Sequence, residues 1–251
     1  MAVQIITGDC RTELGKLADE SIDCVITDPP YGTTSLEWDR VVDCWLDLLP
    51  RVLKQGASVW VFGSMRNLLG LASSEGFDDW NIAQDIVWEK HNGSNAFADR
   101  FRNVHEHAIQ LYHVDQRWQD TYKQPLFSND ARAKVVRRKA RPQQWGDIGG
   151  ATYRSEDGGP RMMRSVLCAR SEHGRALHPT QKPVSLLQAL VEYSCPEGGT
   201  ILDPFAGSGS TGIAAQSLNR NAILIEIDPA YAEIARQRHR DDCPMFAEQS
   251  A

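Results

Sequence analysis

The sequence lacks several features that would place the protein in a particular class. It has no run of about 18 apolar residues, which a membrane-spanning helix requires, and no basic segment followed by a long apolar run at its start. Its 6 cysteines include no Cys-x-x-Cys pair, so they form neither a zinc ligand set nor a recognisable disulfide framework. The segment His105–His113 has Ile109 where a zinc-protease motif needs its second histidine. We therefore expect a cytoplasmic protein that has no membrane-spanning segment, no disulfide bond and no metal site.

The chain has 251 residues, 41% of them apolar, which is enough for one large domain with or without an insertion. Its net charge of −6 is uneven, because residues 115–176 carry 13 lysines and arginines against 7 acidic residues. The segment Lys134–Arg141 carries 5 positive charges and no acid. A solvated loop is one interpretation. A basic segment within an acidic protein also suits contact with nucleic-acid phosphates and base edges. We predict DNA contacts by Lys134, Arg137, Arg138, Lys139, Arg141, Gln143 and Gln144.

Short apolar runs alternate with helix-like segments along most of the chain. The runs are residues 3–7, 23–27, 58–62, 82–88, 107–112, 200–203 and 221–227, and the helix-like segments are residues 41–53, 65–74, 184–193, 210–218 and 230–240. This alternation predicts an α/β fold with a mostly parallel sheet and helices on both faces. The alternation stops over residues 114–177. We therefore expect residues 1–113 and 178–251 to form one domain that residues 114–177 interrupt as a basic recognition insertion.

A glycine-rich loop follows the apolar run at residues 200–203. Gly207, Gly209 and Gly212 match the G-x-G-x-x-G pattern, and Glu226 ends the next apolar run, where an acid accepts hydrogen bonds from a ribose. Glycines allow a cofactor to lie against the backbone where a side chain would collide. The loop predicts an adenosine cofactor, which a nicotinamide oxidoreductase would also bind. A tight turn without a ligand is the remaining alternative.

A second unusual segment, "DPPY" at Asp28–Tyr31, ends the run at residues 23–27. Alone it is typical of a turn, because aspartate and proline are common turn formers. Together with "HPTQKP" at His178–Pro183 and "DPFAGSGST" at Asp203–Thr211, in this order, it resembles the amino-group DNA methyltransferases of the β group. The resemblance implies a circularly permuted, Rossmann-like fold with a seven-stranded sheet. It also implies S-adenosylmethionine as the cofactor, with S-adenosylhomocysteine as the product.

The resemblance assigns roles to particular residues. The catalytic set is Asp28, Pro29, Pro30 and Tyr31. The cofactor set is Asp9, Cys10, Asp28, Thr180, Gln181, Lys182, Asp203, Phe205, Ala206, Gly207, Ser208, Gly209, Ser210, Thr211, Glu226 and Ile227. In this assignment Asp9 contacts the adenine and Glu226 the ribose. Phe205 lies against the methionine part, and Thr180, Gln181 and Lys182 meet its amino-acid end.

The expected substrate is an exocyclic amine of a base flipped out of double-stranded DNA. Asp28 and the Pro29 carbonyl would accept the two amine hydrogens, Pro30 would stiffen the loop, and Tyr31 would stack on the base. Adenine N6 is favoured, because the related cytosine-N4 enzymes usually have serine in place of Asp28. The chain has no Pro-Cys dipeptide, which cytosine ring-carbon methyltransferases need. A silent DNA-binding regulator is a further alternative. The resemblance also implies a homodimer of bacterial or phage origin.

Overall fold

The computed structural model describes residues 2–32, 35–36, 38–74, 76–94, 99, 101–138, 151–172, 174 and 176–242. The chain divides into two compact units, residues 1–124 with 165–251, and residues 125–164. The second unit is therefore shorter than the insertion expected at residues 114–177. Within the described ranges, no helix has both the length and the apolar character needed to cross a membrane.

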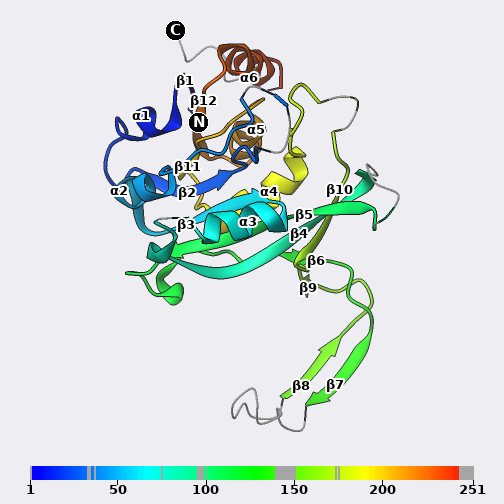
Figure 1. The fold of residues 1–251 in the computed structure, drawn as a ribbon. Helices are drawn as coiled ribbons and strands as arrows, with labels where there is room; N and C mark the ends of the chain where they lie inside the picture. The colour runs from blue at the N-terminus through cyan, green and yellow to red at the C-terminus, as the bar shows by residue number, and fades with distance from the viewer. Residues whose placement is uncertain are drawn as a thin grey trace. The chain divides into compact units, whose positions relative to one another are not determined.

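The first unit contains an eight-stranded sheet with the order β1-β12-β11-β2-β3-β5-β4-β10 (Figure 1). The strands are β1 (Val3–Thr7), β2 (Ile22–Thr27), β3 (Leu53–Gly63), β4 (Trp80–Ser94), β5 (Asn103–His113), β10 (Val166–Ala169), β11 (Thr200–Asp203) and β12 (Asn221–Glu226). All neighbouring pairs are parallel except those of β5, which is antiparallel to β3 and β4. The predicted mostly parallel sheet is confirmed. Its predicted seven strands differ from the eight found, because β10 pairs with β4 inside the range expected as an insertion.

The helices of this unit follow the predicted segments with two exceptions, an unpredicted helix at Cys10–Leu14 and the segment at residues 41–53. They are α1 (Cys10–Leu14), α2 (Leu49–Val52), α3 (Met65–Ala72), α4 (Val184–Ser194), α5 (Ser210–Ser217) and α6 (Pro229–Asp242), with the 3-10 turns η1 (Leu46–Leu48), η2 (Phe77–Asp79) and η3 (Trp118–Asp120). The helix predicted over residues 41–53 is wrong in its first part, because residues 41–45 form no helix and only η1 and α2 form after them. Cys44 has a φ of 61°, which interrupts a right-handed helix, and Pro50 lies in the first turn of α2, where its missing N–H costs nothing.

The sheet has an apolar core on each face. Val59 and Val61 of β3 pack in one core together with Leu68 of α3. Trp60 and Phe62, the alternate residues of the same strand, pack in the other core with the buried leucines of α4. Helices α3 and α4 therefore cover opposite faces of the sheet (Figure 1).

The chemically important residues lie where parallel strands end. Strand β2 lies beside β11, with Ile201 opposite Cys24, so the carboxyl ends of these two strands meet. Asp28 follows β2, Asp203 ends β11 and Glu226 ends β12. Side chains at this edge of an open α/β sheet surround its ligand crevice.

The second unit is built from two short antiparallel pairs. Strand β6 (Phe127–Ser128) pairs with β9 (Arg161–Met162), and β7 (Lys134–Arg138) pairs with β8 (Ala151–Ser155). Figure 1 shows β7 and β8 as a two-stranded ribbon.

Candidate active site

A cavity of about 420 Å³ opens at the carboxyl edge of the parallel strands. Every residue predicted for catalysis or cofactor binding lines this cavity except Gly209. These residues come from segments as far apart in the chain as Asp9 and Ile227. The fold therefore brings together the motifs that the sequence places near its two ends.

The backbone of the "DPPY" segment is held at both ends. Before it, the Thr27 hydroxyl donates to Asp203 Oδ1 at 2.9 Å. After it, Asn67 Nδ2 donates to the Tyr31 carbonyl at 3.2 Å, and the Gly32 N–H donates to Asp39 Oδ1 at 2.8 Å. Gly32 has a φ of 64°, which glycine adopts without strain. The segment is a rigid turn that leaves the strand directly into the cavity.

Both carboxylate oxygens of Asp28 have donors within the protein. The Tyr31 hydroxyl donates to Oδ1 at 2.5 Å, and Lys182 Nζ donates to Oδ2. Burial raises the pKa of Asp28, and the Lys182 ammonium acts in the opposite direction. The bond to Asp28 fixes the position of the Tyr31 ring at the cavity wall, where the sequence predicts a stacking surface.

Lys182, predicted to meet the cofactor's amino-acid end, lines the cavity and also pairs with two carboxylates. Its buried ammonium forms ion pairs with Asp28 and with Glu106 Oε2, the latter at 3.3 Å. Burial acts to lower the pKa of Lys182, but the two carboxylates outweigh burial and raise it. Lys182 is therefore charged at neutral pH, and its charge is directed at Asp28.

Glu226 and Asp9 lie on the side of the cavity formed by β12 and β1. Glu226 Oε2 accepts from the Gly207 N–H at 2.7 Å and Oε1 accepts from the Asp228 N–H at 2.9 Å. Asp9 caps α1 and forms a bidentate pair with Arg11, which lowers the pKa of Asp9. Glu226 thus fixes the backbone of Gly207, the first glycine of the loop.

Asp203 has internal partners for its buried carboxylate. Thr211 donates to Oδ2 at 2.6 Å, while Thr27 and the Phe205 N–H both donate to Oδ1. Burial raises the pKa of Asp203 to about 6, against the effect of these donors. The carboxylate joins the end of β2 to the start of α5, which is a structural role in addition to the predicted cofactor contact.

The glycines of the loop have different local environments. A Cβ on Gly207 would lie 3.3 Å from the His178 ring, at the cavity. A Cβ on Gly212 would lie 2.7 Å from Leu224 of β12, so this glycine allows α5 to pack closely on the sheet. Gly209 has a φ of 77°, and its Cβ would lie 3.0 Å from Ala235 of α6. The last two glycines serve internal packing.

The "HPTQKP" segment contacts the glycine loop directly. Gln181 Oε1 accepts from the Ser208 hydroxyl at 3.0 Å, and the Ser210 hydroxyl accepts from Arg238 at 2.8 Å. The Thr180 hydroxyl lies 3.0 Å from His178 Nδ1. These polar side chains therefore hold one another in place through direct hydrogen bonds.

Four residues without a predicted role lie at or beside the cavity: Trp38, His178, Tyr231 and Glu106. His178 lies between Trp38 and Tyr231, with ring centroids 4.8 Å and 4.3 Å away. Burial, helped by Lys182, lowers the pKa of His178 to about 4, so the ring is neutral at pH 7. Glu106, on β5, is the fourth residue. Strand alternation could have identified Glu106, because it shares a strand face with the apolar Ala108.

The predicted DNA contacts fall mostly outside the described side chains. Lys134 is exposed at the start of β7, and Arg137 and Arg138 belong to the same strand. The other predicted contacts, Lys139, Arg141, Gln143 and Gln144, lie outside the described residues.

Two solved structures have a similar fold. The M1.HpyAVI-SAM complex aligns with a TM-score of 0.63 at 22% identity and covers 94% of this chain and 99% of that chain. PvuII DNA methyltransferase, a cytosine-N4-specific protein, aligns with a TM-score of 0.64 at 15% identity and covers 93% of this chain and 85% of that chain. At these identities the alignments establish a shared mixed α/β fold.

The sequence comparisons go further than the fold. The type II methyltransferase M.HinfI of Haemophilus influenzae is 30% identical over 268 residues, which cover 96% of this chain and 69% of that protein. The family model N6_N4_Mtase, a DNA methylase model, matches residues 22–237. This range includes both the "DPPY" segment and the glycine loop. The chain therefore belongs to the N6 and N4 amino methyltransferase family of DNA methylases.

Proposed function

We propose that the protein transfers a methyl group from S-adenosylmethionine to the N6 amino group of an adenine flipped out of double-stranded DNA. The observation that carries this proposal is that Asp28 lines the same cavity as the glycine loop and Glu226. A similar fold binds SAM in the M1.HpyAVI complex. The early position of β2 and the late position of β11 support the circularly permuted version of the fold.

In this proposal the cofactor lies across the carboxyl ends of β11 and β12. Glu226 accepts from the ribose hydroxyls, and Asp9 and Ile227 lie near the adenine. Phe205 covers the methionine part, and its ring is held by an edge-to-face contact with Trp45, with centroids 5.4 Å apart. The cavity volume of about 420 Å³ falls in the range of small-molecule sites.

The chemical task is to use a weak nucleophile. The lone pair of an exocyclic amine is delocalised into the base, so the nitrogen is planar and poorly basic. Asp28 and the Pro29 carbonyl accept the two amine hydrogens, which draws the nitrogen toward tetrahedral geometry. Positive charge develops on the nitrogen as the methyl group leaves the sulfonium, and the carboxylate favours this transition state over the ground state. Tyr31 provides a face for the flipped base.

The choice of adenine over cytosine rests on Asp28. The shared fold does not distinguish adenine-N6 from cytosine-N4 methylation, since PvuII DNA methyltransferase has a similar fold and is cytosine-N4-specific. An aspartate at the first position of the motif supports adenine, because the related cytosine-N4 enzymes usually have serine there.

The product identifies the reaction. We expect labelled S-adenosylmethionine to transfer its methyl group to unmethylated double-stranded DNA, with N6-methyladenine as the labelled nucleoside after digestion. Label in N4-methylcytosine would instead support methylation of the cytosine N4 amino group. DNA binding by a folded protein with no labelled nucleoside would support a silent regulator.

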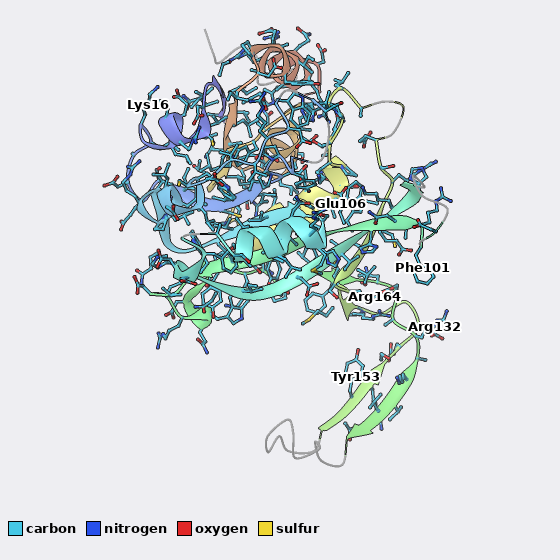
Figure 2. All side chains as sticks on the ribbon, in the orientation of Figure 1. Lys16, Phe101, Glu106, Arg132, Tyr153 and Arg164 are labelled. Atoms are coloured by element: carbon cyan, nitrogen blue, oxygen red, sulfur yellow. The ribbon has the colours of Figure 1, made fainter. Side chains whose placement is uncertain are left out.

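We further propose that residues 114–177 recognise the DNA. Most of these residues belong to the second compact unit, residues 125–164. Residues 125–164 carry 9 lysines and arginines against 4 acidic residues. Val135 and Tyr153 of the β7–β8 ribbon are more than half exposed, and Figure 2 labels Tyr153 together with Arg132. Such a ribbon is narrow enough for the major groove.

Replacing Arg137, Arg138 and Lys139 together by glutamine should weaken DNA binding and leave cofactor affinity unchanged. The slope of log Kd against log salt should fall by about 2 to 3, because each lost phosphate contact removes about 0.9. The matched control replaces Lys16, Lys54 and Arg240, which carry the same total charge outside residues 114–177. Equal loss of DNA and cofactor affinity in the first triple variant would contradict a recognition role.

A homodimer and a cytoplasmic location, in a bacterium or a phage-infected cell, stay predictions from the family resemblance. Light scattering of the purified protein at several concentrations tests the first. A mass equal to one chain throughout would contradict the dimer.

A further inference from the structure

Four charged side chains form a network beside the cavity. Asp28 follows β2, Lys182 precedes α4, Glu106 belongs to β5 and Lys90 to β4. Their side chains are 14%, 7%, 19% and 21% exposed, so all four charges are largely removed from water. The two carboxylates and the two ammonium groups have opposite charges that cancel, and buried charges are tolerated when they are paired in this way.

Lys182 lies at the centre of this network. Its ammonium pairs with Asp28 on one side and with Glu106 Oε2 on the other, and the Phe62 ring lies 5.2 Å away. Glu106 Oε1 is occupied by Lys90. The order of the contacts is therefore Lys90, Glu106, Lys182, Asp28, with the cavity at the Asp28 end.

The reversed direction of β5 brings Glu106 to the site. Because β5 is antiparallel to β3 and β4, its first residues lie at the edge where the parallel strands end, with His107 opposite Gly63. Glu106 pairs with Trp88 across the sheet and shares the face of Ala108, which packs with α4. Figure 2 labels Glu106 on this strand.

The network affects how well Asp28 can accept hydrogen bonds. A buried lysine paired with Asp28 alone would neutralise the carboxylate that the target amine needs. Because the Lys182 ammonium also pairs with Glu106, its electrostatic attraction is shared between the Asp28 and Glu106 carboxylates. We propose that Glu106 is a positioning residue for methyl transfer, which shares Lys182 with Asp28 and so keeps the Asp28 carboxylate available to the target amine. This inference rests on the proposed function and deepens it.

Replacing Glu106 by glutamine tests the inference, because it keeps the shape and removes the charge. Lys182 then pairs with Asp28 alone, and we expect the single-turnover rate at saturating DNA and cofactor to fall at least about tenfold. The variant Glu106→Asp keeps the charge and should retain most of the rate. Dissociation constants for S-adenosylmethionine and DNA should change less than about twofold in both variants.

The pH profile separates positioning from a structural role. The titratable groups around Asp28 are Tyr31, Lys182 and Glu106, with Lys90 behind Glu106 and Asp203 at the neighbouring strand end. The Glu106 carboxylate raises the pKa of Asp28, so its removal should lower that pKa. Because Asp28 acts in its ionised form, the acid limb of the rate profile should move to lower pH in Glu106→Gln. A merely structural role would lower thermal stability and leave this limb in place.

Two further measurements make the outcome decisive. The control Glu89→Gln makes the same chemical change at an exposed residue of β4 that contacts Cys168. Glu106→Gln behaving like this control in rate and pH profile would overturn the inference. A ¹³C NMR titration of the Asp28 carboxyl, assigned with Asp28→Asn, tests the expected pKa change without methyl transfer. A wild-type protein that transfers no methyl group would refute the proposed function, and the titration would still decide the role of Glu106.

Discussion

Replacing Asp28 by alanine should lower the single-turnover rate of methyl transfer by about 10²–10³-fold, the loss typical of one preorganised electrostatic contact. The carboxylate lies at the cavity wall, between the Tyr31 hydroxyl and the Lys182 ammonium. A carboxylate has more acceptor positions than these two donors occupy, so it can also accept the hydrogens of the amine. Alanine removes that acceptor and the negative charge opposite the developing positive charge.

A second variant guards against a folding defect, because alanine leaves buried Lys182 with one partner fewer. Asp28→Asn keeps the volume and one oxygen, and should also be slow, since its amide donates where the amine needs an acceptor. Calorimetric titration with S-adenosylmethionine should give an affinity within a few-fold of the wild type for both variants. A rate for Asp28→Asn equal to the wild type would exclude a catalytic role for Asp28.

Replacing Asp203 by alanine should destabilise the ligand-free protein by about 3 kcal/mol or more. The change leaves the Thr27 and Thr211 hydroxyls and the Phe205 N–H without their acceptor, and each buried group left unsatisfied costs about 1–3 kcal/mol. For a chain of this size the loss corresponds to a fall of roughly 6–12 °C in Tm. Calorimetry or circular dichroism in the absence of cofactor measures it.

The control for this prediction is Asp19→Ala, whose side chain is 72% exposed and pairs with Arg51 at the surface. We expect it to change stability by less than about 1 kcal/mol. If Asp203 acted only by contacting the cofactor, Asp203→Ala would bind S-adenosylmethionine weakly and unfold at the wild-type temperature. That result would contradict the structural role.

The motif residues could be placed together from the sequence because of one property of parallel sheets. The runs before Asp28, Asp203 and Glu226 are short and apolar, so each predicts a buried strand that ends at a carboxylate. The carboxyl ends of neighbouring parallel strands meet, and the ligand lies there. The cavity at this edge is lined by these three residues.

Other features depended on contacts that no local pattern encodes. Strand β10 has exposed and half-buried residues in alternation and pairs with β4, about 80 residues earlier in the chain. Its pairing, and not its composition, makes it a strand. The ion pair between Lys182 and Glu106 joins residues from a loop and a reversed strand. Predicting it required both the direction of β5 and the path of the chain before α4.

The reversed strand β5 has a consequence for how target preference can change. Glu106 is held within the sheet by pairing with β4, and not by the segment at residues 125–164. The groups that we propose surround the reacting amine thus belong to the first unit, while the basic β7–β8 ribbon belongs to the second. If this unit recognises the DNA as we propose, its exchange between relatives would alter which DNA sequence is bound and leave the charge balance around Asp28 intact.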